Sequence, residues 1–261
     1  MFDYIKNRDG KRIFAVIDYP SGKGPFGAVL IIHGFTGFSS ERHLNEISRD
    51  LVDKGFLTLR PDLTKNPGRS YLEFSNVTYN QELKDCEDSL EFLLNMEEVD
   101  INRVGIAGHS LGGMIAAEVA SKRKEIRALA TLSAVYSAKF QINRIFGKTY
   151  EKALKDFKSK GFTTRWSDHM GKRLKIKKSF ADDFVGRTVD DFAKNIKCPT
   201  LVISSGKDEA VIQEQADSYL KNIGARDKSM EIIEGSDHVY TGEALNKVAP
   251  IVANWFAKKL I

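Results

Sequence analysis

A serine set between glycines, directly after an apolar run, constrains the fold of this chain more than any other feature. Residues 103–107 are typical of a buried strand, and they lead into Gly108-His109-Ser110-Leu111-Gly112. Residues 111–120 are small or helix-forming, so they predict a helix packed closely against a sheet. Glycine suits positions where a turn brings backbones together, because it has no Cβ to clash. The sequence therefore predicts a strand, a sharp turn presenting Ser110, and a helix.

A second glycine turn lies upstream, where the apolar run 28–32 ends in His33-Gly34-Phe35-Thr36-Gly37. A serine that attacks a carbonyl group creates negative charge on the carbonyl oxygen, and fixed backbone N–H groups stabilise that charge best. A turn after a buried strand can supply one such group, and the residue after the nucleophile can supply the other. We therefore predict an oxyanion hole formed by the N–H groups of Phe35 and Leu111.

The base that would activate Ser110 is predicted to be His238, which follows the strand-like run 230–233 in a polar loop. A loop at the end of a late strand is a suitable place for such a base. The other histidines belong to the two turns, to a helix start or to a lysine-rich insert: His33, His109, His43 and His169. None of these four is expected to act as the base.

The carboxylate that orients the base is predicted to be Asp208, because it follows the strand-like run 199–204. Two neighbouring acids are rivals. Glu209 should point away from its neighbour, and Asp237 is adjacent in the chain to the histidine that it would have to face. The predicted catalytic order along the chain is therefore Ser110, Asp208, His238.

These motifs, in this order, resemble the α/β-hydrolase superfamily over nearly the whole chain. Within it, the turn at 33–37 and the elbow at 108–112 are similar to bacterial carboxylesterases of the cinnamoyl or feruloyl esterase type, and to monoacylglycerol-lipase-like enzymes. Dienelactone hydrolases look less similar because they carry a cysteine nucleophile, and haloalkane dehalogenases are disfavoured because theirs is an aspartate. The resemblance implies a serine esterase that needs neither a cofactor nor a metal ion.

The alternation of strand-like and helix-like segments independently predicts an α/β fold, a mostly parallel sheet with helices on both faces. We expect one domain over residues 1–261, beginning with antiparallel segments at 1–5 and 11–19. Asp62 and residues 68–70 are interpreted as turn residues. Parallel strands are expected at 28–32, 57–59, 103–107, 127–134, 199–204 and 229–233, and helices at 41–54, 79–96 and 244–258.

Residues 136–197 interrupt this alternation and are predicted to form a cap over the elbow. The insert holds 16 Lys and Arg against 7 Asp and Glu, so it carries more than the whole net charge of +5. Lys148, Lys152 and Lys155 have the spacing of a solvated helix face, which is favoured over an anion site. Its aromatic residues are expected mainly to pack the cap, although some could line a pocket: Tyr136, Phe140, Phe146, Phe162, Trp166, Phe180 and Phe184.

Composition predicts a compact cytoplasmic protein, since the N-terminal segment lacks the apolar core of a signal peptide and no stretch has the length of a membrane span. Cys86 and Cys198 form neither a disulfide framework nor a metal-ligand spacing. We expect no nucleic-acid or membrane partner, and a homodimer is left open.

The expected function is hydrolysis of small acyl or aryl esters, including hydroxycinnamoyl esters, through an acyl-enzyme. Alternatives on the same fold are a monoacylglycerol lipase, a thioesterase, or a binding module without catalysis. The cap's charge could also favour substrates that carry a carboxylate.

Overall fold

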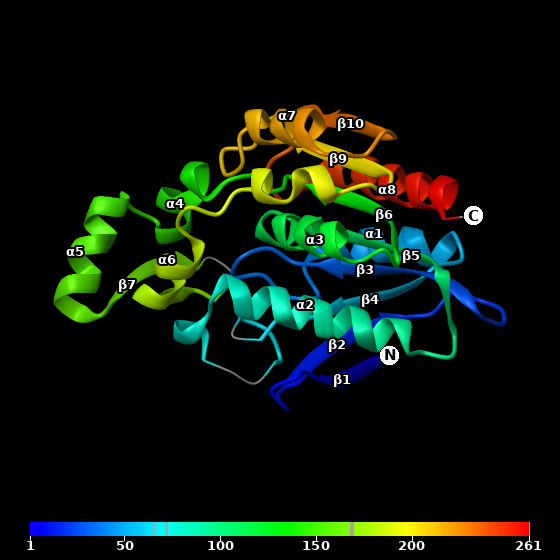
Figure 1. Ribbon diagram of the computed structural model, residues 1–261, viewed down its shortest axis with the longest axis horizontal. Coiled ribbons are helices and arrows are strands. Elements are labelled where there is room, and N and C mark those ends of the chain that lie inside the picture. Colours follow the sequence, from blue (N-terminus) through cyan, green and yellow to red (C-terminus); the bar gives the residue numbers. More distant parts are fainter. Residues whose placement is uncertain (65, 71–72, 168–169, 261) are drawn as a thin grey trace.

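The computed structural model describes residues 1–64, 66–70, 73–167 and 170–260, and its centre is an eight-stranded sheet (Figure 1). The strand order is β1-β2-β4-β3-β5-β6-β9-β10. The strands of this sheet are β1 (Phe2–Lys6), β2 (Arg12–Asp18), β3 (Phe26–Ile32), β4 (Leu57–Pro61), β5 (Val99–His109), β6 (Ile126–Leu132), β9 (Thr200–Ser205) and β10 (Lys228–Ile233).

Because the central strands are parallel, their carboxyl ends lie at the same edge of the sheet. Pairing is parallel from β4 through β3, β5, β6 and β9 to β10, whereas β1 and β2 are antiparallel to their neighbours. Parallel strands share the edge at which their carboxyl ends emerge, and ligands of open α/β sheets bind there. The predicted α/β-hydrolase fold is confirmed, including its antiparallel start.

Helices cover both faces of the sheet because side chains of a strand alternate between the faces. On β3, Val29 and Ile31 pack with α1 and α8, whereas Leu30 and Ile32 pack with the helices of the opposite face. All four side chains are fully buried. The helices are α1 (Arg42–Asp53) and α8 (Leu245–Lys259) on one face, and α2 (Tyr79–Leu94), α3 (Leu111–Lys122) and α7 (Gln213–Asn222) on the other.

Residues 138–184, most of the chain between β6 and β9, form a group of elements at one end of the molecule (Figure 1). Three of its helices carry a buried apolar face that joins the core cluster of α2 and α3. Strands β7 and β8 pair only with each other, as an antiparallel hairpin. The elements are α4 (Ala138–Phe146), α5 (Tyr150–Lys160), β7 (Phe162–Ser167), β8 (Lys172–Lys177) and α6 (Lys178–Phe184).

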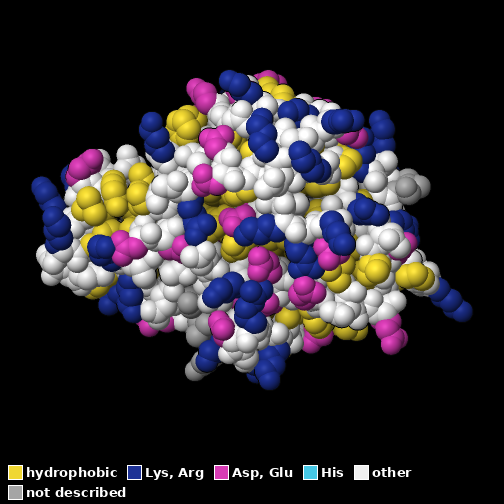
Figure 2. Space-filling model, viewed as in Figure 1, with side chains coloured by type: hydrophobic (Ala, Val, Ile, Leu, Met, Phe, Trp, Pro, Cys, Tyr) yellow, Lys and Arg dark blue, Asp and Glu magenta, His cyan; other side chains and the backbone are white. Residues whose placement is uncertain are grey.

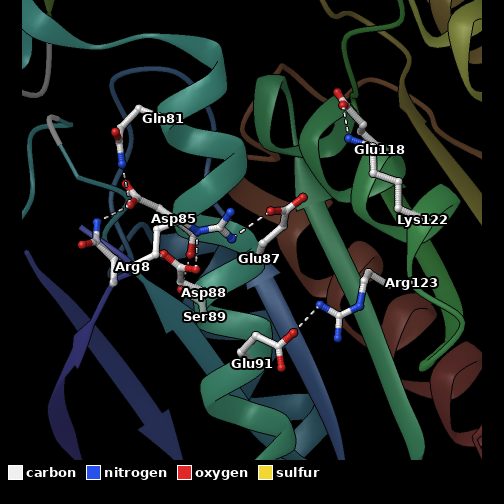
Figure 3. Close-up of polar contacts among 11 residues, drawn as sticks. Arg8, Gln81, Asp85, Glu87, Asp88, Ser89, Glu91, Glu118, Lys122 and Arg123 are labelled. Carbon is white, nitrogen blue, oxygen red and sulfur yellow. Dashed lines mark hydrogen bonds and ion pairs between the residues drawn. The ribbon is translucent and has the colours of Figure 1, made fainter. Parts of the chain in front are cut away.

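Ion pairs connect α2 to its surroundings on the outer side (Figure 3). Arg8, which follows β1, binds Asp88 at 2.8 Å and Glu87 at 2.9 Å, and Arg123 at the end of α3 binds Glu91 at 2.7 Å. Exposed pairs of this kind contribute little stability individually. They orient α2 relative to its neighbours, while the buried apolar face holds it to the sheet.

Charge is distributed over the surface without a single-sign face in the view of Figure 2, where Lys and Arg side chains are interspersed with Asp and Glu. Asp156 of α5 pairs with Lys148, which precedes the helix, at 2.8 Å and with Lys160 of the same helix at 3.1 Å. Two of the insert's lysines are therefore neutralised locally by one acid. Within the described residues, no helix is long and apolar enough to cross a membrane.

Candidate active site

The turn between β5 and α3 holds Ser110 in a left-handed backbone conformation, with φ of 54° and ψ of −121°. A non-glycine residue rarely adopts such a conformation, and it persists only where the surroundings impose it. Here the Ser110 N–H donates to the carbonyl of Leu132 at 2.9 Å, and the Ser110 carbonyl accepts from Gly113 and Val135 at 3.0 Å each. The predicted strand, sharp turn and helix are all present.

Glycine is required at the elbow because backbones meet there. A Cβ on Gly108 would lie 2.2 Å from the carbonyl oxygen of Gly112, and one on Gly112 would lie 2.2 Å from that of His33. No Cβ can be accommodated at these distances without moving backbone. The same close approach brings the turn at 33–37 against the elbow, since a Cβ on Gly34 would lie 3.0 Å from the Cβ of Ser110.

The two predicted oxyanion donors lie at this junction. Leu111 begins α3, and the first N–H groups of a helix have no acceptor within it. In the turn, the Thr36 N–H donates to Asn66 and the Gly37 N–H to the Gly34 carbonyl, whereas the Phe35 N–H has no acceptor among the described residues. Phe35 and Leu111 both line the cavity that contains Ser110.

The loop that follows β4 supports this turn through hydrogen bonds. One carboxylate oxygen of Asp62 accepts the Ser39 N–H at 2.6 Å and the other accepts the Arg69 N–H at 2.5 Å. The Nδ1–H of His33 donates to the Gly34 carbonyl at 2.8 Å, so its Nε2 is free to accept the Leu63 N–H at 3.0 Å. His33 and Asp62 thus act as structural groups, which agrees with their interpretation as turn residues.

His238 and Asp208 form a hydrogen-bonded pair, with 2.8 Å between His238 Nδ1 and Asp208 Oδ2. The other oxygen of Asp208 accepts the N–H groups of Ala210 and Val211, at 2.7 and 2.8 Å. Burial opposes ionisation of Asp208, but these hydrogen bonds outweigh it and lower the pKa of the carboxyl. The carboxylate therefore holds the proton of His238 on Nδ1, which leaves Nε2 as the basic nitrogen.

Among the described residues, the His238 ring is hydrogen-bonded to Asp208 and to neither rival acid. Asp237 accepts the backbone N–H and the hydroxyl of Thr241, at 2.9 and 2.6 Å, and so caps its own loop. Glu209 is exposed. Of the rejected histidines, His33 and His109 are buried in the turns and His43 is buried in α1, whereas His169 lies outside the described residues.

A cavity of about 440 Å³ connects these groups, with Ser110 and His238 in its wall. Its floor is the elbow and the turn at 33–37, and its roof comes from α4 and β7. The roof residues are Gln141, Arg144, Ile145, Arg165 and Ser167. Sequence analysis did not single out any of these five, because nothing in the insert's local pattern distinguishes a cavity-facing side from a solvated one.

The cap aromatics serve mainly as packing. Phe146, Phe180 and Phe184 are fully buried in the core, and none of the seven aromatics proposed from the sequence is among the described residues that line the cavity. The aromatic wall is instead Phe35, whose ring packs at a tilt of 41° against that of Phe180, with 4.8 Å between ring centres. The guanidinium of Arg165 lies 5.5 Å from the centre of the same Phe35 ring.

Neither thiol is equipped for nucleophilic chemistry. Burial raises the pKa of Cys198 to about 11 and that of Cys86 well above its ordinary value. Both cysteines are free.

Two family models match this chain. Residues 13–143 match the dienelactone hydrolase family, and residues 82–239 match the C-terminal region of the BAAT and acyl-CoA thioester hydrolase family. The first match shows that the chain is related to the dienelactone hydrolases despite the difference in nucleophile. Position 110 of this chain is a serine.

Two curated proteins are similar to parts of this chain. Esterase EstD of Thermotoga maritima is 25% identical over 93% of this chain and 65% of its own length. A putative carboxymethylenebutenolidase of Aquifex aeolicus is 30% identical over 48% of this chain and 57% of its own length. The chain thus spans about three fifths of the length of these relatives.

A solved structure resembles the whole chain. Est1E from Butyrivibrio proteoclasticus with bound ferulic acid superposes with a TM-score of 0.85, at 26% identity and 98% coverage of both chains. The structure of DcsB with a substrate analogue has a TM-score of 0.82 at 17% identity, which supports the fold alone.

The contact at Gly112 generates a stability prediction. Gly112→Ala places a methyl group against the His33 carbonyl, so we expect unfolding to become easier by about 1–3 kcal/mol, the usual cost of overpacking. Ser121→Ala, near the end of the same helix, should stay within about 0.5 kcal/mol of wild type. Thermal and urea unfolding measure both. Equal stability of Gly112→Ala and wild type would contradict the close packing described here.

Proposed function

The chain belongs to the dienelactone hydrolase family of α/β-hydrolases, and on this premise we propose that it is a serine hydrolase of small carboxylic esters. The observation that carries the proposal is the pair of His238 Nδ1 and Asp208 Oδ2, 2.8 Å apart, in a cavity shared by His238 and Ser110. The likeness to an esterase over 93% of this chain supports it.

In the proposed reaction, Ser110 Oγ forms a bond to the ester carbonyl carbon while its proton passes to His238 Nε2. The N–H groups of Phe35 and Leu111 stabilise the negative oxygen, and Asp208 stabilises the imidazolium. Collapse breaks the bond to the alcohol, which leaves with the proton from His238. Water then gives a proton to His238 and attacks the acyl-enzyme, and the carboxylic acid departs as Ser110 recovers its proton.

The proposed substrates have a short acyl or an aryl group, with hydroxycinnamoyl esters as the narrower proposal. A wall that combines Phe35 and Ile145 with Arg144 and Arg165 suits a compact group with a polar end better than a long alkyl chain. The ferulic acid held by Est1E supports the narrower proposal. A thioester substrate is the second candidate, because residues 82–239 match the acyl-CoA thioester hydrolase family.

The test of the enzyme proposal is labelling with a serine-directed fluorophosphonate, followed by peptide mapping. We expect the label on Ser110 and its absence from Ser110→Ala. In that variant kcat should fall by about 10⁵ to 10⁶, because the groups of a triad act as a unit. A folded Ser110→Ala protein that keeps a tenth of wild-type activity would refute the role of Ser110, and an unlabelled wild type would favour a binding module.

The choice of acid is tested by two matched substitutions. Asp208→Asn should lower kcat by about 10⁴, since the imidazole loses its orientation and its tautomer. Asp237→Asn leaves the pair of His238 and Asp208 intact, so its effect should be much smaller. Both are measured at one pH, and a larger loss in Asp237→Asn would reverse the assignment.

Substrate choice is tested by kcat/KM for p-nitrophenyl acetate, butyrate and palmitate, for methyl ferulate, for a short thioester and for a monoester of a dicarboxylic acid, which carries a free carboxylate. We expect short esters to be preferred, and esters with a free carboxylate to gain from Arg144, an advantage that Arg144→Gln and added salt should reduce. Lys152→Gln, on exposed α5, is the control. Preference for palmitate with activation at an interface would contradict the small-ester proposal, and no turnover of methyl ferulate would remove only the narrower one.

A further inference from the structure

Three polar atoms next to the active-site cavity are buried and have no hydrogen-bond partner: Glu41 Oε2, His43 Nε2 and His109 Nδ1. They come from the residue before α1, from α1 itself and from the elbow, and one possible metal-binding atom of each of these residues lies within 4.8 Å of the other two. The two histidines are only 2% and 3% exposed. Buried polar atoms are almost always hydrogen-bonded, so three unpaired ones on neighbouring residues indicate a missing ligand.

The protonation state of His109 can be assigned from its other nitrogen. His109 Nε2 lies 2.8 Å from the backbone carbonyl of His238, and a carbonyl oxygen can only accept. Nε2 therefore carries the hydrogen, and Nδ1 of the neutral ring presents a lone pair to the cluster. Histidines that bind metal ions characteristically donate their second N–H to a carbonyl or carboxylate in this way.

The surroundings favour neutral rings and oppose ionisation of the carboxyl group. Burial, with the neighbouring histidines, lowers the pKa of His109 well below its ordinary value, and burial with the charge of His238 lowers that of His43 to about 3. Burial raises the pKa of Glu41 to about 7. The negative charge of Asp62 raises it further, whereas a backbone hydrogen bond from Phe38 lowers it.

We propose that Glu41, His43 and His109 bind one divalent transition-metal ion of the zinc class. Two imidazole nitrogens and one carboxylate oxygen form a known zinc donor set, and zinc bonds of about 2.0–2.2 Å bring such atoms together with small side-chain movements. Glu41 and His109 also line the cavity, so the cluster lies beside it. This proposal does not depend on the esterase proposal, because it rests on atoms outside the proposed catalytic triad.

Sequence analysis did not predict this site, because its ligands have no zinc-motif spacing. Glu41 and His43 are two residues apart at a helix start, and His109 is 66 residues further along the chain. Only the approach of the elbow to α1, with ring centres of His43 and His109 4.4 Å apart, brings the three together.

The test is Zn²⁺ binding by protein first stripped with a chelator. We expect one zinc ion per chain to remain bound through gel filtration. Glu41→Gln and His43→Gln should each weaken zinc binding at least about a hundredfold. Loss of a residue that only supports a ligand already weakens binding about 10- to 100-fold, and loss of the ligand itself should cost more. Glu46→Gln, on the surface of the same helix, should bind like wild type. Circular dichroism confirms that each variant is folded.

A measurement on wild type alone covers the case in which a variant does not fold. Co²⁺ at this site should give the intense visible absorption of a four-coordinate ion, and zinc-edge absorption spectroscopy should detect two imidazoles. Absence of zinc binding by wild type would overturn the proposal, and a buried water would then be the partner of the three unpaired atoms. Unchanged binding in both folded variants, or a six-coordinate spectrum, would overturn it equally.

Discussion

The backbone contact between the elbow and the turn after β3 is the constraint on which the rest of the site depends. Gly112 lies so close to the His33 carbonyl that no side chain can separate them. Since β3 and β5 are neighbouring parallel strands, their ends emerge side by side and the two turns must share one small volume. Ser110 and the N–H groups of Phe35 and Leu111 are thereby positioned by main chain rather than by flexible side chains, which favours preorganised stabilisation of charge.

Polar groups behind this contact fix the turns in place. Asp62 and His33 satisfy backbone donors and acceptors of the turn, and Asp208 is satisfied by two N–H groups as well as by His238. Such networks are stabilising only when their members are paired. The unpaired atoms of Glu41, His43 and His109 contrast with these satisfied neighbours, and that contrast gives the cluster its significance.

The parts of the fold and site that sequence analysis predicted are those with a local signal. Ser110, Asp208 and His238 each follow an apolar run, so their meeting at one edge follows from a parallel sheet. The roof of the cavity has no such signal, because the choice of Arg144 and Arg165 as its lining depends on how α4 and β7 pack. The hairpin of β7 and β8 was likewise not predicted, since its lysine-rich segments have the composition of solvated helix.

The base of the insert is closed by its own backbone. Ala138 N–H donates to the Arg187 carbonyl at 2.9 Å, and Val189 N–H donates to the Tyr136 carbonyl at 2.8 Å, so entry and exit of the insert lie side by side. The entropy of closing a loop changes only slowly with its length, and here the ends are already joined. The roughly 50 residues between these two hydrogen bonds can therefore be replaced by a longer or shorter segment at little entropic cost. Such a replacement would change the residues that line the top of the cavity and leave the elbow that presents Ser110 as it is.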